Sequence, residues 1–150
     1  MTQSLSQLYI HIIFHAKKHC YIHEQDSERI YSYIGGIITE RNSVPICING
    51  TKNHIHIFCI LSKNYSLAKF VQEIKASSSK WIKSIGPHFR DFEWQKGYAA
   101  FSVSPSIKEK TIKYVLNQQE HHRKQTFQEE YIMFLKEYNV EYNEKYLWED

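Results

Sequence analysis

A short apolar segment that carries two histidines constrains the fold of this chain most strongly. Residues 54–61 read His-Ile-His-Ile-Phe-Cys-Ile-Leu, and Asn49-Gly50 lies just before them. β-Branched and aromatic residues favour a strand, and Asn-Gly is typical of a hairpin turn. Because side chains alternate along a strand, His54 and His56 should share one face, with the apolar residues at odd positions on the other.

Two imidazoles on one strand face can bind a divalent cation. The chain holds 9 His in 150 residues, so a His-x-His pair also arises easily by chance. If the first predicted strand lies beside this one, His11 or His15 would stand near the pair, although a histidine in such a position is more often a satisfied or partly exposed one. His54 and His56 are therefore candidate metal ligands whose role depends on the rest of the chain.

Length and composition favour one globular domain. With 150 residues, of which 42% are hydrophobic and 23% charged, the chain can bury its own core. We expect a single domain over residues 1–150, with a C-terminal helix and tail from about residue 126. The chain lacks an apolar run near the roughly 20 residues that a membrane span requires, and it lacks a signal-peptide pattern. The three cysteines lack Cys-x-x-Cys spacing, which argues against a disulfide framework or a Cys-based zinc site. A cytoplasmic protein without membrane association is the resulting expectation.

Net charge and aromatic content hint at a polyanionic partner. The formal net charge is +3, and 15% of the residues are aromatic. Aromatic rings near Lys and Arg suit single-stranded nucleic acid, because bases stack on the rings and phosphates pair with the cations. Rings also fill cores and subunit interfaces, so the composition favours nucleic acid only weakly.

Hydrophobic spacing predicts alternating strands and helices. Alternation and β-branched runs predict strands at residues 8–15, 44–48, 54–61 and 98–103. Stripes at i, i+3, i+4 and i+7 predict helices at about 26–40 and 66–85, and capping boxes at Ser106 and Thr126 predict the starts of two more. The order β-α-β-β-α-β-α-α predicts an α+β fold, an antiparallel sheet with helices packed on one face, of the ferredoxin-like or split βαβ type. The aromatic tail from residue 139 should dock onto the rest.

The second predicted helix offers basic side chains to a nucleic acid. Lys75, Lys80 and Lys83 lie off its apolar stripe, where they could contact phosphates. A solvated helix face explains them equally well, because no base-reading motif accompanies them. They are candidate DNA-binding residues.

The third predicted helix places a tyrosine, an amide and an imidazole together. At about 100° per residue, Tyr114, Gln118 and His121 share one face, whereas His122 lies roughly 80° from the tyrosine. Such a row is unusual for core packing, and an exposed helix edge is the alternative.

The combination of these motifs resembles the IS200/IS605-like single-tyrosine transposases, which belong to the His-hydrophobic-His endonucleases. The resemblance rests on His54-Ile55-His56 in a strand together with Tyr114 and Gln118 on a later helix. It covers essentially the whole chain and includes residues 94–98, 101–104 and 114–124 and the ending Tyr146–Glu149. Together these motifs are specific, whereas the histidine pair alone is not.

The resemblance implies a metal-dependent single-stranded DNA transposase. In the family, the two strand histidines and the glutamine four residues after the tyrosine bind Mg2+ or Mn2+; here these are His54, His56 and Gln118. The tyrosine, here Tyr114, attacks a DNA phosphodiester, forms a 5′-phosphotyrosine link and releases a 3′-hydroxyl that later reseals the strand. Family substrates are single-stranded DNA with hairpins, and members commonly form homodimers. His121 is a candidate for an additional ligand or a phosphate contact.

Three points stay open at this level. Many relatives carry an acidic residue before the first histidine, where this chain has Asn53, so a carboxylate partner must come from elsewhere. Imidazole suits Mn2+ better than Mg2+, and we leave both ions open. The active site can assemble within one chain or between the two subunits of a dimer.

Two rival functions fit part of the pattern. A catalytically inactive, domesticated relative would be a single-stranded nucleic-acid-binding module. A different metal-dependent phosphodiesterase would use His54 and His56 with water as the nucleophile, and would cleave without forming a protein adduct. The intact tyrosine, glutamine and histidine pair favour the transposase over the inactive module.

Overall fold

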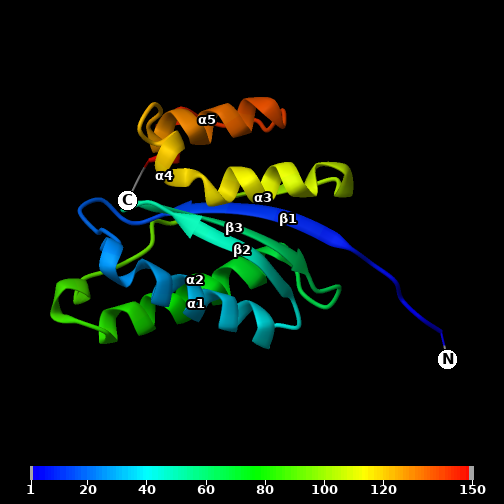
Figure 1. Cartoon of the computed structure of the whole chain (residues 1–150), viewed down its shortest axis with the longest axis horizontal. Coiled ribbons are helices and arrows are strands. Elements are labelled where there is room, and N and C mark those ends of the chain that lie inside the picture. Colours follow the sequence, from blue (N-terminus) through cyan, green and yellow to red (C-terminus); the bar gives the residue numbers. More distant parts are fainter. Residues whose placement is uncertain (1, 149–150) are drawn as a thin grey trace.

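The computed structural model describes residues 2–148 and contains a four-stranded antiparallel sheet (Figure 1). The strands are β1 (Leu8–His15), β2 (Val44–Gly50), β3 (His54–Leu61) and β4 (Ala99–Ser102). Their spatial order is β2-β3-β1-β4, and each neighbouring pair is antiparallel. All four predicted strands are present, and β4 is one residue shorter at each end than predicted.

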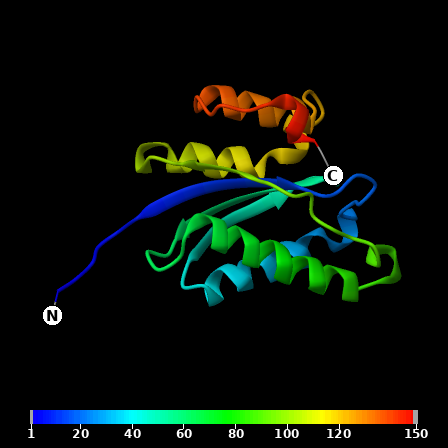
Figure 2. The same ribbon diagram turned by 180° about the vertical axis from the view of Figure 1, so that it is seen from behind.

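Two helices cover one face of the sheet. α1 (Glu24–Glu40) connects β1 to β2, α2 (Leu67–Ser84) connects β3 to β4, and both views place them on the same side (Figure 1, Figure 2). Their apolar stripes pack on the sheet in the main core, which includes Ile34 of α1 and Ile12 of β1. A β-α-β-β-α-β chain with this strand order is the ferredoxin-like arrangement, so the predicted fold class is confirmed.

Helices also cover the second face of the sheet, where the prediction had placed none. α3 (Lys108–Leu116), α4 (Gln118–His121) and α5 (Phe127–Glu137) lie across it, and the short α6 (Glu144–Leu147) follows (Figure 1). The central strands explain this cover, because their second faces are apolar too: Ile13 of β1 and Phe58 of β3 are fully buried there. An apolar sheet face has to be covered by another layer.

The two predicted capping boxes have different outcomes. Thr126 caps α5 as expected: its hydroxyl accepts from the Glu129 N–H, and the Glu129 carboxylate accepts from the Thr126 N–H. The box predicted at Ser106 is wrong, because a 3-10 turn precedes α3 and Ser104 caps that turn instead. Pro105 favours this start, since its fixed φ suits the first position after a cap.

The C-terminal tail docks as predicted, as far as residue 148. The Trp148 ring lies 5.6 Å from the ring of Tyr131 and 6.1 Å from that of Phe127, measured between centroids. The last residue of the motif Tyr146–Glu149 lies outside the described residues. Across residues 2–148, every helix is too short or too polar to cross a membrane.

Replacing Ile34 with alanine tests the packing of α1 on the sheet. Ile34 is fully buried, so Ile34→Ala should lower the free energy of unfolding by about 2–5 kcal/mol through lost burial and a residual cavity. Urea unfolding followed by circular dichroism measures the change. Leu5→Ala, at a side chain that is 85% exposed, is the control and should change it by less than about 0.5 kcal/mol. Equal effects of the two substitutions would contradict the packing described.

Candidate active site

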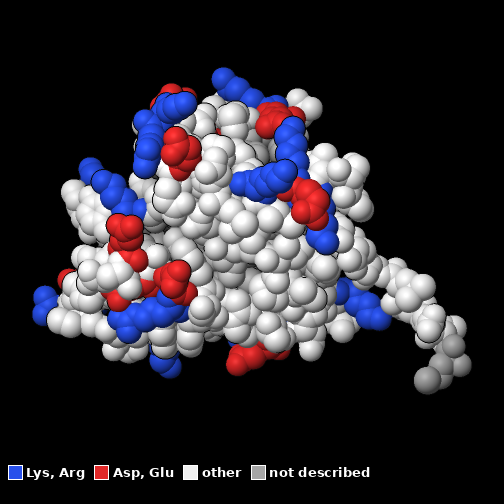
Figure 3. Space-filling view, in the orientation of Figure 1, with Lys and Arg blue, Asp and Glu red and all other residues white. Residues whose placement is uncertain are grey.

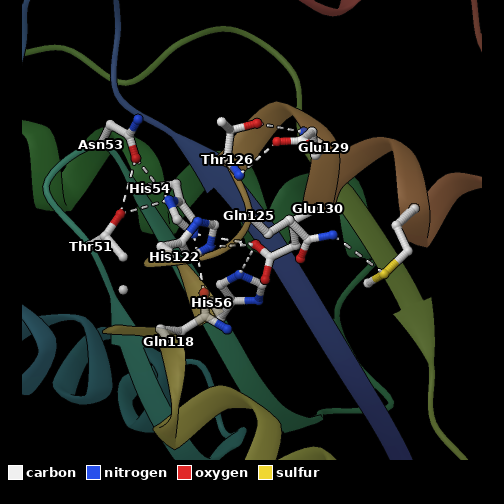
Figure 4. A network of polar contacts seen from close by, with 12 residues as sticks. Thr51, Asn53, His54, His56, Gln118, His122, Gln125, Thr126, Glu129 and Glu130 are labelled. Carbon is white, nitrogen blue, oxygen red and sulfur yellow. Dashed lines mark hydrogen bonds and ion pairs between the residues drawn. The ribbon is translucent and has the colours of Figure 1, made fainter. Parts of the chain in front are cut away.

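β3 delivers the two predicted histidines to the face that α3, α4 and α5 cover. His54 and His56 are fully buried there, while Ile55 between them belongs to the main core on the other face. In the close view, both imidazoles point toward Glu130 of α5, and Gln118 of α4 lies beside them (Figure 4). The alternation predicted from the sequence therefore brings both rings to one enclosed place.

Neighbouring polar groups determine which nitrogen of His54 carries the proton. Its Nδ1 lies 2.9 Å from Oδ1 of Asn53 and 2.9 Å from Oγ1 of Thr51. An amide oxygen can only accept a hydrogen bond, so Nδ1 is the donor and Nε2 keeps its lone pair. Asn53 thus orients the imidazole as a neutral acceptor, in the way that outer partners orient metal-binding histidines.

The lone pair of His54 faces two further acceptors. Its Nε2 lies 3.2 Å from Oε1 of Gln118 and 3.4 Å from Oε1 of Glu130. The Gln118 amide nitrogen donates to the Tyr114 carbonyl at 3.4 Å, which turns the amide oxygen toward the histidine. Acceptors that face one another with no proton between them repel unless a cation lies among them. The arrangement therefore fits a metal ion.

His11 of β1 holds the second histidine of the pair. Its Nε2 lies 2.7 Å from Nδ1 of His56. Burial, with the charge of His56 as a second cause, holds the pKa of His11 well below its ordinary value. His15, the other β1 histidine considered from the sequence, instead packs its ring 5.1 Å from that of Phe127. Of the two, His11 is therefore the one that orients a candidate ligand.

One carboxylate joins the members of the cluster. Oε1 of Glu130 accepts from Nε2 of His56 at 2.8 Å and from Nε2 of His122 at 3.1 Å. Burial by itself raises the pKa of Glu130, but its contacts with His122, His54 and His56 outweigh burial and hold the pKa below its ordinary value. Glu130 is therefore a charged group in a fully buried position.

Tyr114 reaches the same carboxylate from α3. Its hydroxyl donates to Oε2 of Glu130, so the two oxygens of this carboxylate contact the tyrosine and the histidines respectively. Burial, and then the hydrogen bond to Glu130, raises the pKa of Tyr114 above its ordinary value. The phenol is therefore protonated, and it belongs to the same chain as the histidine pair.

The helix that was predicted to run on from Tyr114 is interrupted. α3 ends at Leu116 and α4 begins at Gln118, and Asn117 between them has φ −103° and ψ 26°. Gln118 lies beside the histidine pair, but the residues after the break do not follow the angles of one continuous helix. The break explains which of the two following histidines joins the cluster.

His122, rather than His121, contacts the buried carboxylate. The two lie next to each other, and only His122 bonds to Glu130. The His121 ring stacks on Tyr114 with centroids 4.3 Å apart, and its buried Nε2 has no hydrogen-bond partner among the described residues. The predicted role of His121 as an additional active-site residue stays a prediction, with a place beside the tyrosine.

Glu130 is a site residue that sequence reasoning missed, although the sequence holds a signal for it. Phe127, Tyr131 and Phe134 form the apolar stripe of α5, and Glu130 falls on the same stripe at i+3. An acidic residue on a stripe that packs against a core needs a partner, and this one could have been marked. No comparable signal separates His122 from the other histidines of the chain.

The candidate DNA-binding lysines lie on the far side of the sheet from this cluster. α2 carries all three and packs on the face opposite α3 (Figure 1). The ammonium group of Lys75 donates to the carbonyls of Gln95 at 2.5 Å and Gly97 at 2.8 Å, and burial lowers its pKa to about 8. Lys80 and Lys83 are exposed. Contact of Lys75, Lys80 and Lys83 with DNA stays a prediction.

The face of the molecule seen in Figure 3 shows no single basic patch. In the view of Figure 3, Lys and Arg side chains alternate with Asp and Glu around the edge of the molecule. A cavity of about 540 Å3 does lie beside the cluster, lined by Thr51, Asn53, His122 and Phe127 among others. The Phe127 ring stacks on that of His54 with centroids 4.3 Å apart and separates it from solvent.

Comparisons with known proteins place these observations in a family. The model of the family described as "Transposase IS200 like" matches residues 4–118, which is most of the chain. No curated protein matches the sequence. Among solved structures, a candidate transposase from Deinococcus radiodurans R1 is similar, with a TM-score of 0.61 and 18% identity over 79% of this chain and 98% of that one. A REP-associated tyrosine transposase bound to a REP hairpin has a TM-score of 0.51 and 10% identity over 77% of this chain and 68% of that one.

The buried histidines should make the protein less stable in mild acid. Burial lowers the pKa of His54 to about 4 from an ordinary 6.5, and the pKa values of His11 and His56 are lowered too. Between about pH 6.5 and 4 the unfolded chain therefore binds protons that the folded chain does not. The contribution of these neutral imidazoles to the free energy of unfolding is fully present above about pH 6.5. It is lost as the pH drops toward 4, by on the order of 3 kcal/mol for His54 alone.

Urea unfolding in EDTA buffers from pH 7 to pH 4 measures this dependence. The variant His54→Gln should show a shallower slope, because one of the groups that take up protons on unfolding is gone. A wild-type stability that stays flat over this range would contradict the neutral, buried state of these imidazoles.

Proposed function

This chain belongs to the IS200-like transposase family, and we propose that it is a metal-dependent single-stranded DNA transposase that nicks and rejoins DNA through a 5′-phosphotyrosine intermediate. The proposal rests on the proximity of Tyr114 to the histidine pair. A single carboxylate, that of Glu130, contacts both the tyrosine hydroxyl and the imidazole of His56. A nucleophile and a cation-binding group thus lie together, as strand transfer requires.

We propose that His54, His56 and Gln118 hold the ion, which is Mg2+ or Mn2+. The fit is supported by the unprotonated Nε2 of His54, which faces the Gln118 oxygen at 3.2 Å. A divalent ion bound here would polarise a phosphoryl oxygen of the DNA and stabilise the charge that develops on it, an effect worth several kcal/mol of barrier.

Tyr114 supplies the nucleophile in this mechanism. Its oxygen bonds to phosphorus while the bond from phosphorus to the 3′-oxygen breaks, and the phenol proton ends on the released 3′-hydroxyl. The strand is resealed when a 3′-hydroxyl attacks the phosphotyrosine link and the tyrosine regains a proton. One phosphoester replaces another in each step, so no external energy source is needed. The raised pKa of Tyr114 means that the free phenol is a poor nucleophile until the site is occupied.

We propose single-stranded DNA with a hairpin as the substrate. The support is the family itself and the similar structure of a REP-associated tyrosine transposase bound to a REP hairpin. A homodimer is proposed from the family resemblance. Because Tyr114 and the histidine pair meet within one chain, the dimer would not be needed to bring them together.

Covalent capture of DNA tests the proposal. The substrate is single-stranded, hairpin-bearing DNA from the ends that flank the gene, labelled at its 3′ end because the 5′-phosphate side stays on the protein. With Mn2+ or Mg2+, a denaturing gel should show a labelled band at the size of the protein, and EDTA should remove it. Tyr114→Phe should abolish the band because phenylalanine has no oxygen to attack phosphorus, and His54→Ala should abolish it by removing a metal ligand.

Tyr33→Phe is the matched control, since Tyr33 stacks on Trp81 away from the site and should leave the band unchanged. Cleavage without a protein band would instead identify water as the nucleophile. Binding of the same DNA without metal-dependent cleavage would identify an inactive binding module. Either result contradicts the proposed function.

A further inference from the structure

We propose that His122 and Glu130 complete the metal centre with His54 and His56, giving three imidazole nitrogens and one carboxylate oxygen that suit a first-row transition-metal dication rather than Mg2+. The proposal deepens the proposed function and depends on it only in placing an ion at the histidine pair. Both added residues lie beyond residue 118, where the match to the family model ends.

The donor atoms of the four side chains already converge. All of them lie within 4.8 Å of one another. Oε1 of Glu130 lies 2.8 Å from Nε2 of His56, 3.1 Å from that of His122 and 3.4 Å from that of His54. Metal–ligand bonds of about 2.0–2.1 Å place neighbouring donors of a tetrahedral site about 3.3 Å apart. The three separations from Glu130 are therefore close to those of such a site.

The charge of the cluster also calls for a cation. Glu130 is fully buried, and within residues 2–148 all its ion-pair partners are histidines. A buried carboxylate without a positive partner is costly. His54 cannot supply a proton from Nε2, because Asn53 fixes its proton on Nδ1. His56 and His122 donate hydrogen bonds to the carboxylate from Nε2. A dication that takes the place of these protons would balance the carboxylate and would also use the free lone pair of His54.

The types of donor select the kind of ion. Three imidazoles and one carboxylate resemble the donor sets of transition-metal sites, in which imidazole is a common ligand. Mg2+ prefers six oxygen donors and keeps several waters, and three buried imidazoles match that preference poorly. The oxygen of Gln118, 3.2 Å from Nε2 of His54, would be a further, neutral ligand of the same ion.

The same carboxylate would connect the ion to the nucleophile. The second oxygen of Glu130 accepts a hydrogen bond from the hydroxyl of Tyr114, and Figure 4 shows the carboxylate beside the imidazoles of His56 and His122. Occupation of the site would therefore alter a group that holds the tyrosine hydroxyl. Glu130, which lies beyond the family match, thus contacts both the candidate metal ligands and the candidate nucleophile.

Metal titration of the full chain tests the proposal without any DNA. After EDTA treatment and dialysis, Mn2+ and Mg2+ are each titrated calorimetrically into the wild type, Glu130→Gln, His122→Asn and His54→Ala. Mn2+ is the probe rather than Zn2+, because the chain has free cysteines at Cys20, Cys47 and Cys59 that would bind zinc.

Two variants serve as matched controls. Glu129→Gln changes the neighbouring carboxylate and preserves the helix cap, since glutamine also completes a capping box. His19→Asn removes an exposed imidazole at a residue with φ 69°, a conformation that asparagine tolerates. Both should bind Mn2+ within about twofold of the wild type, because neither residue belongs to the cluster.

The expected result is one Mn2+ site whose affinity falls at least about tenfold in Glu130→Gln and in His122→Asn. Loss of a ligand should weaken metal binding at least as much as loss of a residue that only hydrogen-bonds to a ligand. His54→Ala should lose the site, and Mg2+ should bind the wild type at least about tenfold more weakly than Mn2+. Thermal melting in EDTA checks folding; if Glu130→Gln does not fold, His122→Asn decides, since that side chain is 12% exposed.

Wild-type affinity for Mn2+ in both Glu130→Gln and His122→Asn would overturn the proposal, as would Mg2+ binding as tightly as Mn2+ or no Mn2+ binding at all. These outcomes are independent of the DNA assay. If the four-residue site binds Mn2+ but no phosphotyrosine forms, the proposed function fails and this inference stands.

Discussion

The buried negative charge of Glu130 is the interaction on which the second layer of the molecule and its candidate site both depend. One oxygen of this carboxylate accepts hydrogen bonds from His56 of β3 and from His122, which follows α4. The other oxygen accepts from the hydroxyl of Tyr114 of α3. α5 carries Glu130 on its apolar stripe, between Phe127 and Tyr131. The stripe therefore docks α5 on the sheet by burial of apolar surface. The carboxylate fixes where the helix lies, because a buried charge needs the polar partners that the histidines and Tyr114 offer.

The need to bury both faces of the central strands explains why such a cluster can exist at all. Seven of the eight residues of β3 are buried, including both histidines. In a sheet with one wet face, His54 and His56 would be hydrated, and their pKa values would not be lowered by burial. Here the same layer that covers Phe58 also removes the imidazoles from water. The polar network is thus a consequence of the packing that surrounds it, and it is stable because each imidazole finds a polar partner.

Much of the fold could be predicted from the sequence, and the site only in part. Strand alternation and helix stripes are local signals, so the four strands and the main helices were found, together with the shared direction of the histidine pair. Gln118 lies only four residues from Tyr114, and the irregular turn at Asn117 leaves its amide oxygen facing His54. Because of the same turn, the angles of a continuous helix did not predict the directions of His121 and His122. The position of Glu130 on the apolar stripe of α5 could have marked it as a residue that needs a partner. The pattern could not identify the histidine pair as that partner, because His54 and His56 are more than 70 positions away along the chain.

One helix, α5, both closes the candidate cation site and contacts the tyrosine. His54 and Gln118 are fully buried, so a DNA phosphate cannot touch them while Phe127 covers the imidazole ring. Phe127 and Glu130 belong to the same helix and face the same cluster. The apolar stripe and the carboxylate of this one helix therefore close the cation site and hold the tyrosine hydroxyl together. The packing of α5 thus decides both how completely the imidazoles are hidden from water and where the nucleophile lies.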